Sequence, residues 1–214
     1  TMEENKMSDN LPVNSSGNLT VPGKAAEITV SGGNNNFVAH ADTVENNITV
    51  MLNDPRSRRG ENRARITFNT DFYHLFVILG EKFEDNYFLV PKDRALTEST
   101  NNELKTKYAS LTPEAIEDLK RYPAIFADEN HSYGKTDDAQ DAYFGFVKDV
   151  KIQDNGIKIY YTIITAIPQQ ILNEHCFELG IGGARSFNEL NRTHWALKQI
   201  NLIEALQKAG VQIF

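Results

Sequence analysis

The chain has 214 residues, of which 40% are hydrophobic, and 22 basic against 29 acidic side chains give it a net charge of −7. This length predicts one domain with an appendage or two small domains, and the negative charge argues against general binding to nucleic acids or anionic membranes. Because Cys176 is the only cysteine, a disulfide within the chain is excluded, and we expect a reducing, cytoplasmic location. We expect neither a membrane span nor a signal peptide, since the chain has no hydrophobic run of the required kind.

The N-terminal part of the chain combines a polar leader with short β-type runs. Residues 1–26 are rich in Asn, Ser and Gly and predict a disordered leader. Between residues 27 and 55, apolar runs such as Ile28–Val30 and Ile48–Leu52 alternate with Asn/Gly turn signals. These runs predict a β arm that pairs by edge addition with another chain or with the main domain, and residues 27–52 are a candidate surface for homo-oligomerisation. The alternative is an unstructured, low-complexity leader.

Residues 56–65 contain five arginines and one glutamate. This local positive charge suggests phosphate contacts, and hence nucleic-acid binding through Arg56 to Arg65. No aromatic residue separates the arginines as a base-stacking surface would require, so we favour a solvated linker.

Residues 66–214 predict an α+β main domain, with a mainly antiparallel sheet and short helices on one side of it. Phe72–Leu79 and Tyr87–Val90 have the composition of strands, and residues 80–86 are expected to join them as a hairpin. His74 lies inside an apolar run and is therefore expected to be a structural histidine.

Helix signals follow these strands. We expect a short helix over Glu103–Tyr108 and a second helix that begins with Thr112 as N-cap and Pro113 at the first helical position. Pro168 predicts the start of a helix reaching about Leu179, in which Cys176 is a small core residue. Near the C-terminus, Asn201 and Gly210 are typical of the two ends of a helix, and Glu204 completes a box-like cap.

The clearest β signal is a hairpin in the C-terminal half. Tyr143–Gln153 and Ile157–Ala166 flank the turn sequence Asp154-Asn155-Gly156. In the first of these strands we expect one buried face and one wet face. The residues predicted to be buried are Phe144, Phe146, Val150 and Ile152. A further strand is expected around Ser186–Leu190.

One polar cluster lies between two apolar segments, over residues 127–138. It contains Asp128, Glu129, Asn130, His131, Tyr133, Asp137 and Asp138. Carboxylates with one imidazole suit a divalent ion, for which His131, Asp137 and Asp138 are the candidate ligands, although a single histidine is few for zinc. If the protein is an enzyme, Glu129 and His131 are the candidate acid–base residues. The simplest interpretation is an ordered surface loop, and a polar-ligand site through Glu129, Asn130, His131 and Tyr133 is the functional one.

A second polar cluster spans residues 189–198. Arg192, His194 and Lys198 are candidate ligand-binding residues for an anion near the start of the last helix. The structural interpretation places Trp195 in the core and pairs Arg192 with Glu189 across a turn. The Gly-rich segment 180–183 lacks the order of a phosphate-binding loop.

Three blocks of the main domain carry a resemblance, namely Phe88–Thr97, Glu129–Asp137 and Glu189–Lys198. They resemble an uncharacterised bacterial module that is associated with mobile-element and phage-defence proteins. The resemblance covers about residues 66–214, and the Asn/Gly-rich segment 28–52 resembles linker strands of such proteins. It implies a biological context and carries over no activity.

These observations favour a binding or interaction module without a catalytic role. It would bind a protein partner or a small polar ligand, as a sensor or accessory component of a defence system, and would need no cofactor. The alternative is a metal-dependent hydrolase or nuclease that uses Glu129, His131 and Asp137 with a divalent metal ion. The two interpretations depend on whether the segments 127–138 and 189–198 meet.

Overall fold

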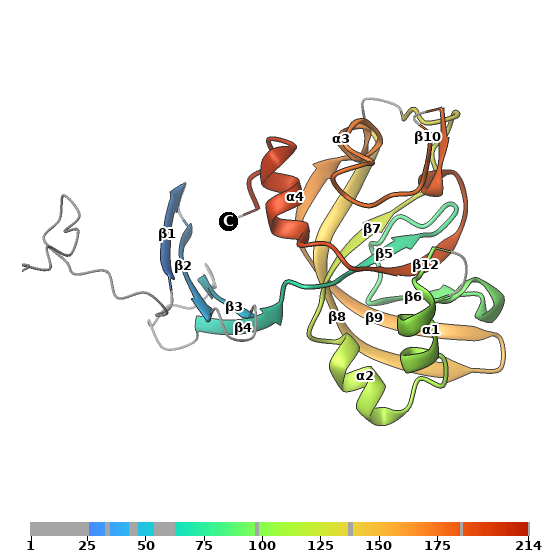
Figure 1. Cartoon of the computed structure of the whole chain (residues 1–214), viewed down its shortest axis with the longest axis horizontal. Helices are drawn as coiled ribbons and strands as arrows, with labels where there is room; N and C mark the ends of the chain where they lie inside the picture. The colour runs from blue at the N-terminus through green and yellow to red at the C-terminus, as the bar shows by residue number, and fades with distance from the viewer. Residues whose placement is uncertain are drawn as a thin grey trace, which may run out of the picture.

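The computed structural model describes residues 26–32, 35–42, 47–53, 63–96, 99–136, 139–184 and 186–213. These residues form a four-stranded sheet, a six-stranded sheet, a two-stranded ribbon and several short helices (Figure 1). Within this part of the chain, no helix combines the length and the apolar character needed to cross a membrane. The predicted leader lies outside the described residues except for its last residue, Ala26.

The four-stranded sheet is an antiparallel meander in the order β1-β2-β3-β4. Its strands are β1 (Ala26–Gly32), β2 (Asn35–Asp42), β3 (Asn47–Asn53) and β4 (Arg63–Asn69). The β-type runs of the predicted arm are therefore strands that pair within the chain. The fourth strand begins inside the segment predicted as a linker and crosses the predicted start of the main domain, because it pairs with β3 over its whole length.

This sheet contributes to the main core through its last two strands. Val50 on β3 and Phe68 on β4 are each 1% exposed, and the Phe68 ring packs on Phe146 with 5.0 Å between ring centroids. Homo-oligomerisation through residues 27–52 stays a prediction. Nucleic-acid binding through Arg56 to Arg65 also stays a prediction, since Arg56 to Arg59 lie outside the described residues.

The six-stranded sheet has the order β12-β5-β7-β8-β9-β6. Its strands are β5 (Tyr73–Val77), β6 (Tyr87–Val90), β7 (Pro123–Ala127), β8 (Asp141–Gln153), β9 (Gly156–Pro168) and β12 (His194–Lys198). Neighbouring strands are antiparallel except β5 and β7, which are parallel. The fold is thus α+β as predicted, with a mixed sheet in place of the mainly antiparallel one.

The predicted hairpin between β5 and β6 is wrong. β5 is buried along its whole length and pairs with β12 and β7, whereas β6 pairs with β9 at the opposite edge of the sheet. Because β5 needs a partner on each side, and β12 and β7 occupy those places, residues 78–86 carry the chain away to the other edge. A short spacing between two strands therefore did not indicate that they pair.

The predicted hairpin between β8 and β9 is confirmed, and Gly156 has a φ of 155° at its turn. The pattern within β8 differs from the prediction, since the register shifts after Val147. Phe144 and Phe146 belong to one core, whereas Val147 and Val150 belong to the other. A β-bulge turns successive side chains to the opposite face, which a strict alternation cannot anticipate. Ile152, predicted to be buried, is 54% exposed near the hairpin tip.

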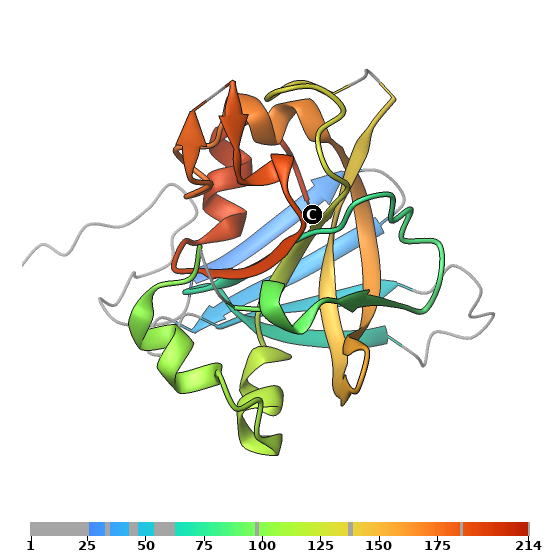
Figure 2. The same cartoon turned by 90° about the vertical axis from the view of Figure 1, so that its right-hand side faces the viewer.

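The helices cover both faces of the six-stranded sheet, so the prediction of helices on one side is wrong. They are η1 (Lys92–Arg94), α1 (Asn102–Tyr108), α2 (Pro113–Leu119), α3 (Gln169–Glu174), η2 (Glu189–Asn191) and α4 (Leu202–Lys208). The green helices α1 and α2 lie together, away from the orange and red helices α3 and α4 (Figure 2). The first pair contributes to a core with Phe76, Phe126 and Trp195, and the second pair to a core with Leu75, Phe144 and Phe146.

Local capping signals account for several helix ends. Thr112 accepts a hydrogen bond from Ala115 N, and Asn201 accepts one from Glu204 N, as the sequence predicts. The helix that follows Pro168 ends at Glu174, earlier than predicted, because His175 leaves the helical conformation with a φ of −112°. The predicted strand at Ser186–Leu190 is shorter: β11 (Phe187–Asn188) forms a ribbon with β10 (Gly183–Ala184) and is followed directly by η2.

Candidate functional site

The two polar clusters of the sequence meet in the structure. Asn130 N donates to Leu190 O over 2.8 Å, which joins the segment after β7 to η2. The Glu129 carboxylate accepts hydrogen bonds through Oε1 from Thr193 N and, at 2.7 Å, from Thr193 Oγ1. Thr193 Oγ1 in turn accepts from Leu79 N at 2.9 Å. Glu129 therefore holds the loop before β12 in place, which is a structural use of the carboxylate.

Buried amides complete the junction between the two clusters. Asn130 and Asn173 exchange a pair of side-chain hydrogen bonds of 2.9 Å each, and Asn188 Nδ2 donates to Asn173 Oδ1 at 2.8 Å. Gln169 Nε2 donates to Asp128 O and to Asn130 Oδ1. No sequence signal pointed to Gln169, Asn173 or Asn188, because isolated amides on separate segments form no motif. Their joint effect is to fix η2 against α3.

Beside this network lies a buried ion pair. Lys198 Nζ lies 2.8 Å from Glu189 Oε1 and 2.7 Å from Oε2, and both side chains are nearly enclosed. Gly182 N also donates to Glu189 Oε1. Burial by itself raises the pKa of the Glu189 carboxyl, but the neighbouring His194 ring, the Lys198 ammonium and the Gly182 amide outweigh it and hold that pKa below its usual value. Glu189 is therefore a carboxylate, and Lys198 is its counter-ion.

His194 lies next to this ion pair and has only one hydrogen-bonded nitrogen. Its Nδ1 is 2.8 Å from Arg192 O, and since a carbonyl oxygen only accepts, Nδ1 carries a hydrogen. Its Nε2 lies 3.4 Å from Glu189 Oε2 but makes no hydrogen bond to any described residue. The residue is only 4% exposed. A buried polar atom in this state needs an explanation, because such atoms are normally paired.

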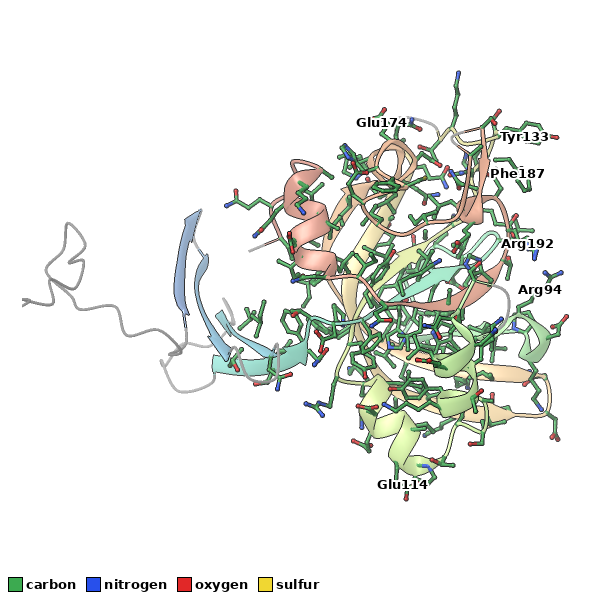
Figure 3. The ribbon with its side chains drawn as sticks, viewed as in Figure 1. Arg94, Glu114, Tyr133, Glu174, Phe187 and Arg192 are labelled. Carbon is green, nitrogen blue, oxygen red and sulfur yellow. The ribbon has the colours of Figure 1, made fainter. Side chains whose placement is uncertain are left out.

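A cavity of about 300 Å³ adjoins His194, and we call it the His194 cavity. It is lined by Ser99, Gly182, Gly183, Phe187, Asn188, Glu189, Arg192 and His194. The β10–β11 ribbon, η2 and the start of β12 thus contribute its walls. The volume is at the lower end of the range for small-molecule sites. Figure 3 shows Arg192 and Phe187 on the same edge of the molecule.

The other predicted site residues are divided between different places. Arg192 and His194 line the His194 cavity, whereas Lys198 does not and is bound to Glu189. His131 lines a second cavity of about 350 Å³ together with Asp128 and Tyr143, so the two histidines do not share a pocket. Tyr133 is 74% exposed, and its ring packs against Phe187.

The predicted metal site finds no support in the described residues. Among them, no group of three or more His, Cys, Asp or Glu side chains has the geometry to hold a metal ion. Asp137 and Asp138 lie outside the described residues. The prediction that Glu129 acts with His131 and Asp137 is therefore not tested for Asp137. The carboxylate of Glu129 is engaged by Thr193.

His74 and Cys176, which the sequence predicts to be structural residues, are both buried in the core. His74 is fully buried, donates through Nε2 to Leu119 O at 2.8 Å, and accepts through Nδ1 from Trp195 Nε1 at 3.1 Å. Burial lowers the pKa of His74 to about 4, which keeps the ring neutral. Cys176 is buried in the core beside α3, where its Sγ contacts Leu172 O and Asn173 O.

Comparison with known proteins places the chain in no family. No family model matches it, and neither a curated protein nor a solved structure does. The resemblance of the main domain to a module of mobile-element and phage-defence proteins thus stays a prediction. The geometry of the His194 cavity is what the structure offers for inferring a function.

Proposed function

We propose that this protein is a binding module whose ligand is a small anion held at Arg192 and His194 in the His194 cavity. One observation carries the proposal: His194 lines the cavity while its buried Nε2 has no hydrogen-bond partner among the described residues. A ligand hydroxyl, such as the O–H of a singly protonated phosphate, would provide the missing donor. Leaving a buried polar atom unpaired costs about 1–3 kcal/mol, so a ligand that pairs with it can recover a free energy of this size.

The charges around the cavity favour an anion. Lys198 neutralises Glu189, the only carboxylate among the lining residues, through contacts to both of its oxygens. Arg192 contributes a guanidinium to the lining of the same cavity. A guanidinium is well suited to phosphate or carboxylate, because it offers several donors in one plane.

The same arrangement favours binding over catalysis. A general base needs an accessible lone pair, and the Glu189 carboxylate is already engaged by Lys198 and by Gly182 N. The alternative of a metal-dependent hydrolase or nuclease gains no support from the described residues, because Thr193 engages the Glu129 carboxylate while His131 lines a different cavity. The biological role that fits this proposal is a sensor or accessory component that responds to a small ligand. A defence context follows only from the resemblance.

The experiment is a titration of the full chain with inorganic phosphate, followed by calorimetry and by the shift in melting temperature. We expect saturable binding that the substitution Arg192→Gln weakens at least about tenfold, because a hydrogen bond to a charged group contributes about 1.5–3 kcal/mol. The matched control is Arg121→Gln, since Arg121 is exposed at the end of α2 and lines none of the cavities described above.

Equal phosphate affinity in the Arg192→Gln variant and the wild type would overturn the proposal, as would the absence of phosphate binding to the wild type. Equal weakening by Arg121→Gln would also overturn it, because the effect would then be one of net charge. A melting temperature without ligand for each variant shows that the fold is retained.

A further inference from the structure

We infer that the ligand of the His194 cavity carries a flat aromatic group beside its anionic group, and belongs to the class of nucleoside monophosphates. This inference rests on the proposed function. Its starting point is an aromatic pair at the cavity mouth, Tyr133 and Phe187, whose ring centroids lie 6.2 Å apart with an interplanar angle of 42°. Phe187 lines the cavity.

Both rings are exposed, which is unusual for large apolar side chains that are near each other. Tyr133 is 74% exposed and Phe187 is 53% exposed. Large exposed aromatics that gather beside a pocket mark a binding surface more often than isolated ones do. Since stacking on a base uses one face of an aromatic ring, a ring exposed at a cavity mouth is a ready platform for it.

The backbone holds both rings in these positions. Tyr133 lies in a tight turn closed by two hydrogen bonds between Ser132 and Lys135. Phe187 pairs with Ala184 in the β10–β11 ribbon. The ribbon requires glycine at position 183, where φ is 104° and a Cβ would lie 2.6 Å from Phe187 O. The platform is therefore built before a ligand arrives, which lowers the entropic cost of binding.

The anionic end of the ligand is assigned to Arg192 and His194. Tyr133, Phe187 and Arg192 follow one another along a single edge of the molecule (Figure 3). Phe187, Arg192 and His194 line the same cavity, so an aromatic group on Phe187 and a phosphate at Arg192 belong to one molecule of modest size. The lone pair on Nε2 of His194 would accept a hydrogen bond from the O–H of a singly protonated phosphate group.

The neighbouring surface limits the length of the phosphate chain. Arg192 also lines an adjoining cavity of about 510 Å³, together with Arg94, Asp93 and Glu129. A longer phosphate chain would meet the two carboxylates there as well as Arg94, whose Nε is 4.0 Å from Asp93 Oδ2. The net charge of −7 likewise disfavours a long nucleic-acid strand. A single phosphate group can contact Arg192 and His194 without extending onto this surface.

The test compares adenosine monophosphate, adenosine and inorganic phosphate by calorimetry on the full chain. We expect the nucleotide to bind about tenfold more tightly than phosphate, in line with the measured worth of one base stacked on an aromatic ring. Phe187→Ala should bring nucleotide affinity to the level of phosphate and leave phosphate affinity unchanged. Phe187→Leu should do the same, because it keeps apolar volume but removes the flat ring.

Phe177→Ala is the matched control, since Phe177 is 92% exposed and lines none of the cavities described above. Nucleotide binding no tighter than phosphate binding, or equal losses for both probes in Phe187→Ala, would overturn this inference and leave the proposed function standing. A wild-type protein that binds no phosphate would overturn both this inference and the proposed function. Binding of the nucleotide at full strength in Phe187→Leu would show apolar contact without stacking, and would also overturn the inference.

Discussion

Two buried histidines lie on neighbouring strands of the six-stranded sheet and differ in how their nitrogens are used. His74 on β5 is fully buried, and both nitrogens have partners, Leu119 O and the indole of Trp195. His194 on β12 is nearly as buried, yet only Nδ1 has a hydrogen-bond partner among the described residues. Burial alone therefore does not distinguish a structural histidine from a candidate ligand-binding one.

The surroundings of the two rings explain the difference. His74 packs against Phe76, Trp195 and Tyr122, with ring centroids 5.5 to 6.0 Å away, so its neutral form is favoured. His194 lies beside the ion pair of Glu189 and Lys198 and beside a cavity. In the aromatic core, both nitrogens of His74 are hydrogen-bonded. At the polar junction, Nε2 of His194 has no hydrogen-bond partner among the described residues.

The largest expected effect concerns the ion pair beside His194. Lys198→Met removes the counter-ion of a buried carboxylate, and we expect it to lower the free energy of unfolding by about 3–5 kcal/mol. Chemical denaturation at neutral pH measures this change. The double variant Glu189→Gln/Lys198→Met should recover more than half of the loss, since no buried charge then lacks a partner. An additive loss in the double variant would contradict the pairing.

The second effect distinguishes His74 by its pH dependence. The pKa of His74 is about 4 in the folded protein and 6.5 as an ordinary value, so the unfolded chain binds the extra proton between these limits. Stability from this neutral ring is complete above pH 6.5 and is lost as the pH falls toward 4, by up to about 3 kcal/mol. The unfolding free energy of the wild type relative to His74→Gln should fall by this amount from pH 7 to pH 4, so that the variant becomes the more stable protein at pH 4. A difference that is constant with pH would refute the assignment.

The smallest effect compares the two histidines directly. His194→Gln keeps a donor for Arg192 O, so we expect a loss of stability below about 1 kcal/mol, but a roughly tenfold loss of phosphate affinity. His74→Gln disturbs a fully satisfied pair of hydrogen bonds and should cost about 2 kcal/mol of stability without changing that affinity. Chemical denaturation measures the loss of unfolding free energy in each variant, and phosphate titration measures the change in affinity in each. The comparison fails if the two variants lose affinity equally.

Part of the fold follows from signals carried by a few adjacent residues. The cap at Asn201, the cap at Thr112 with Pro113 behind it, and the turn that ends at Gly156 were all predicted and are confirmed. Each depends on hydrogen bonds or dihedral preferences within one turn of chain. The burial of His74 followed from its apolar neighbours in the same way.

The failures come from contacts between distant segments. The sequence could not indicate that β6 belongs at the far edge of the sheet, because strand pairing depends on which partners the other strands already have. Nor could it place the register shift in β8, which exchanges the buried faces of a strand that reads as regular alternation. In the candidate site, the predicted anion-binding residue Lys198 is instead the counter-ion of Glu189, nine residues away.

The sequence by itself determined the element types, the main helix caps and the two polar segments, since these depend on neighbours along the chain. Only the tertiary structure decided that the segments meet, through contacts such as Asn130 to Asn191 across 61 residues. It also decided that His194 has an unpaired nitrogen at a cavity while His74 has none. The physical reason is that hydrogen-bond satisfaction and charge neutralisation belong to the packed environment of a side chain, and the sequence specifies that environment only after folding.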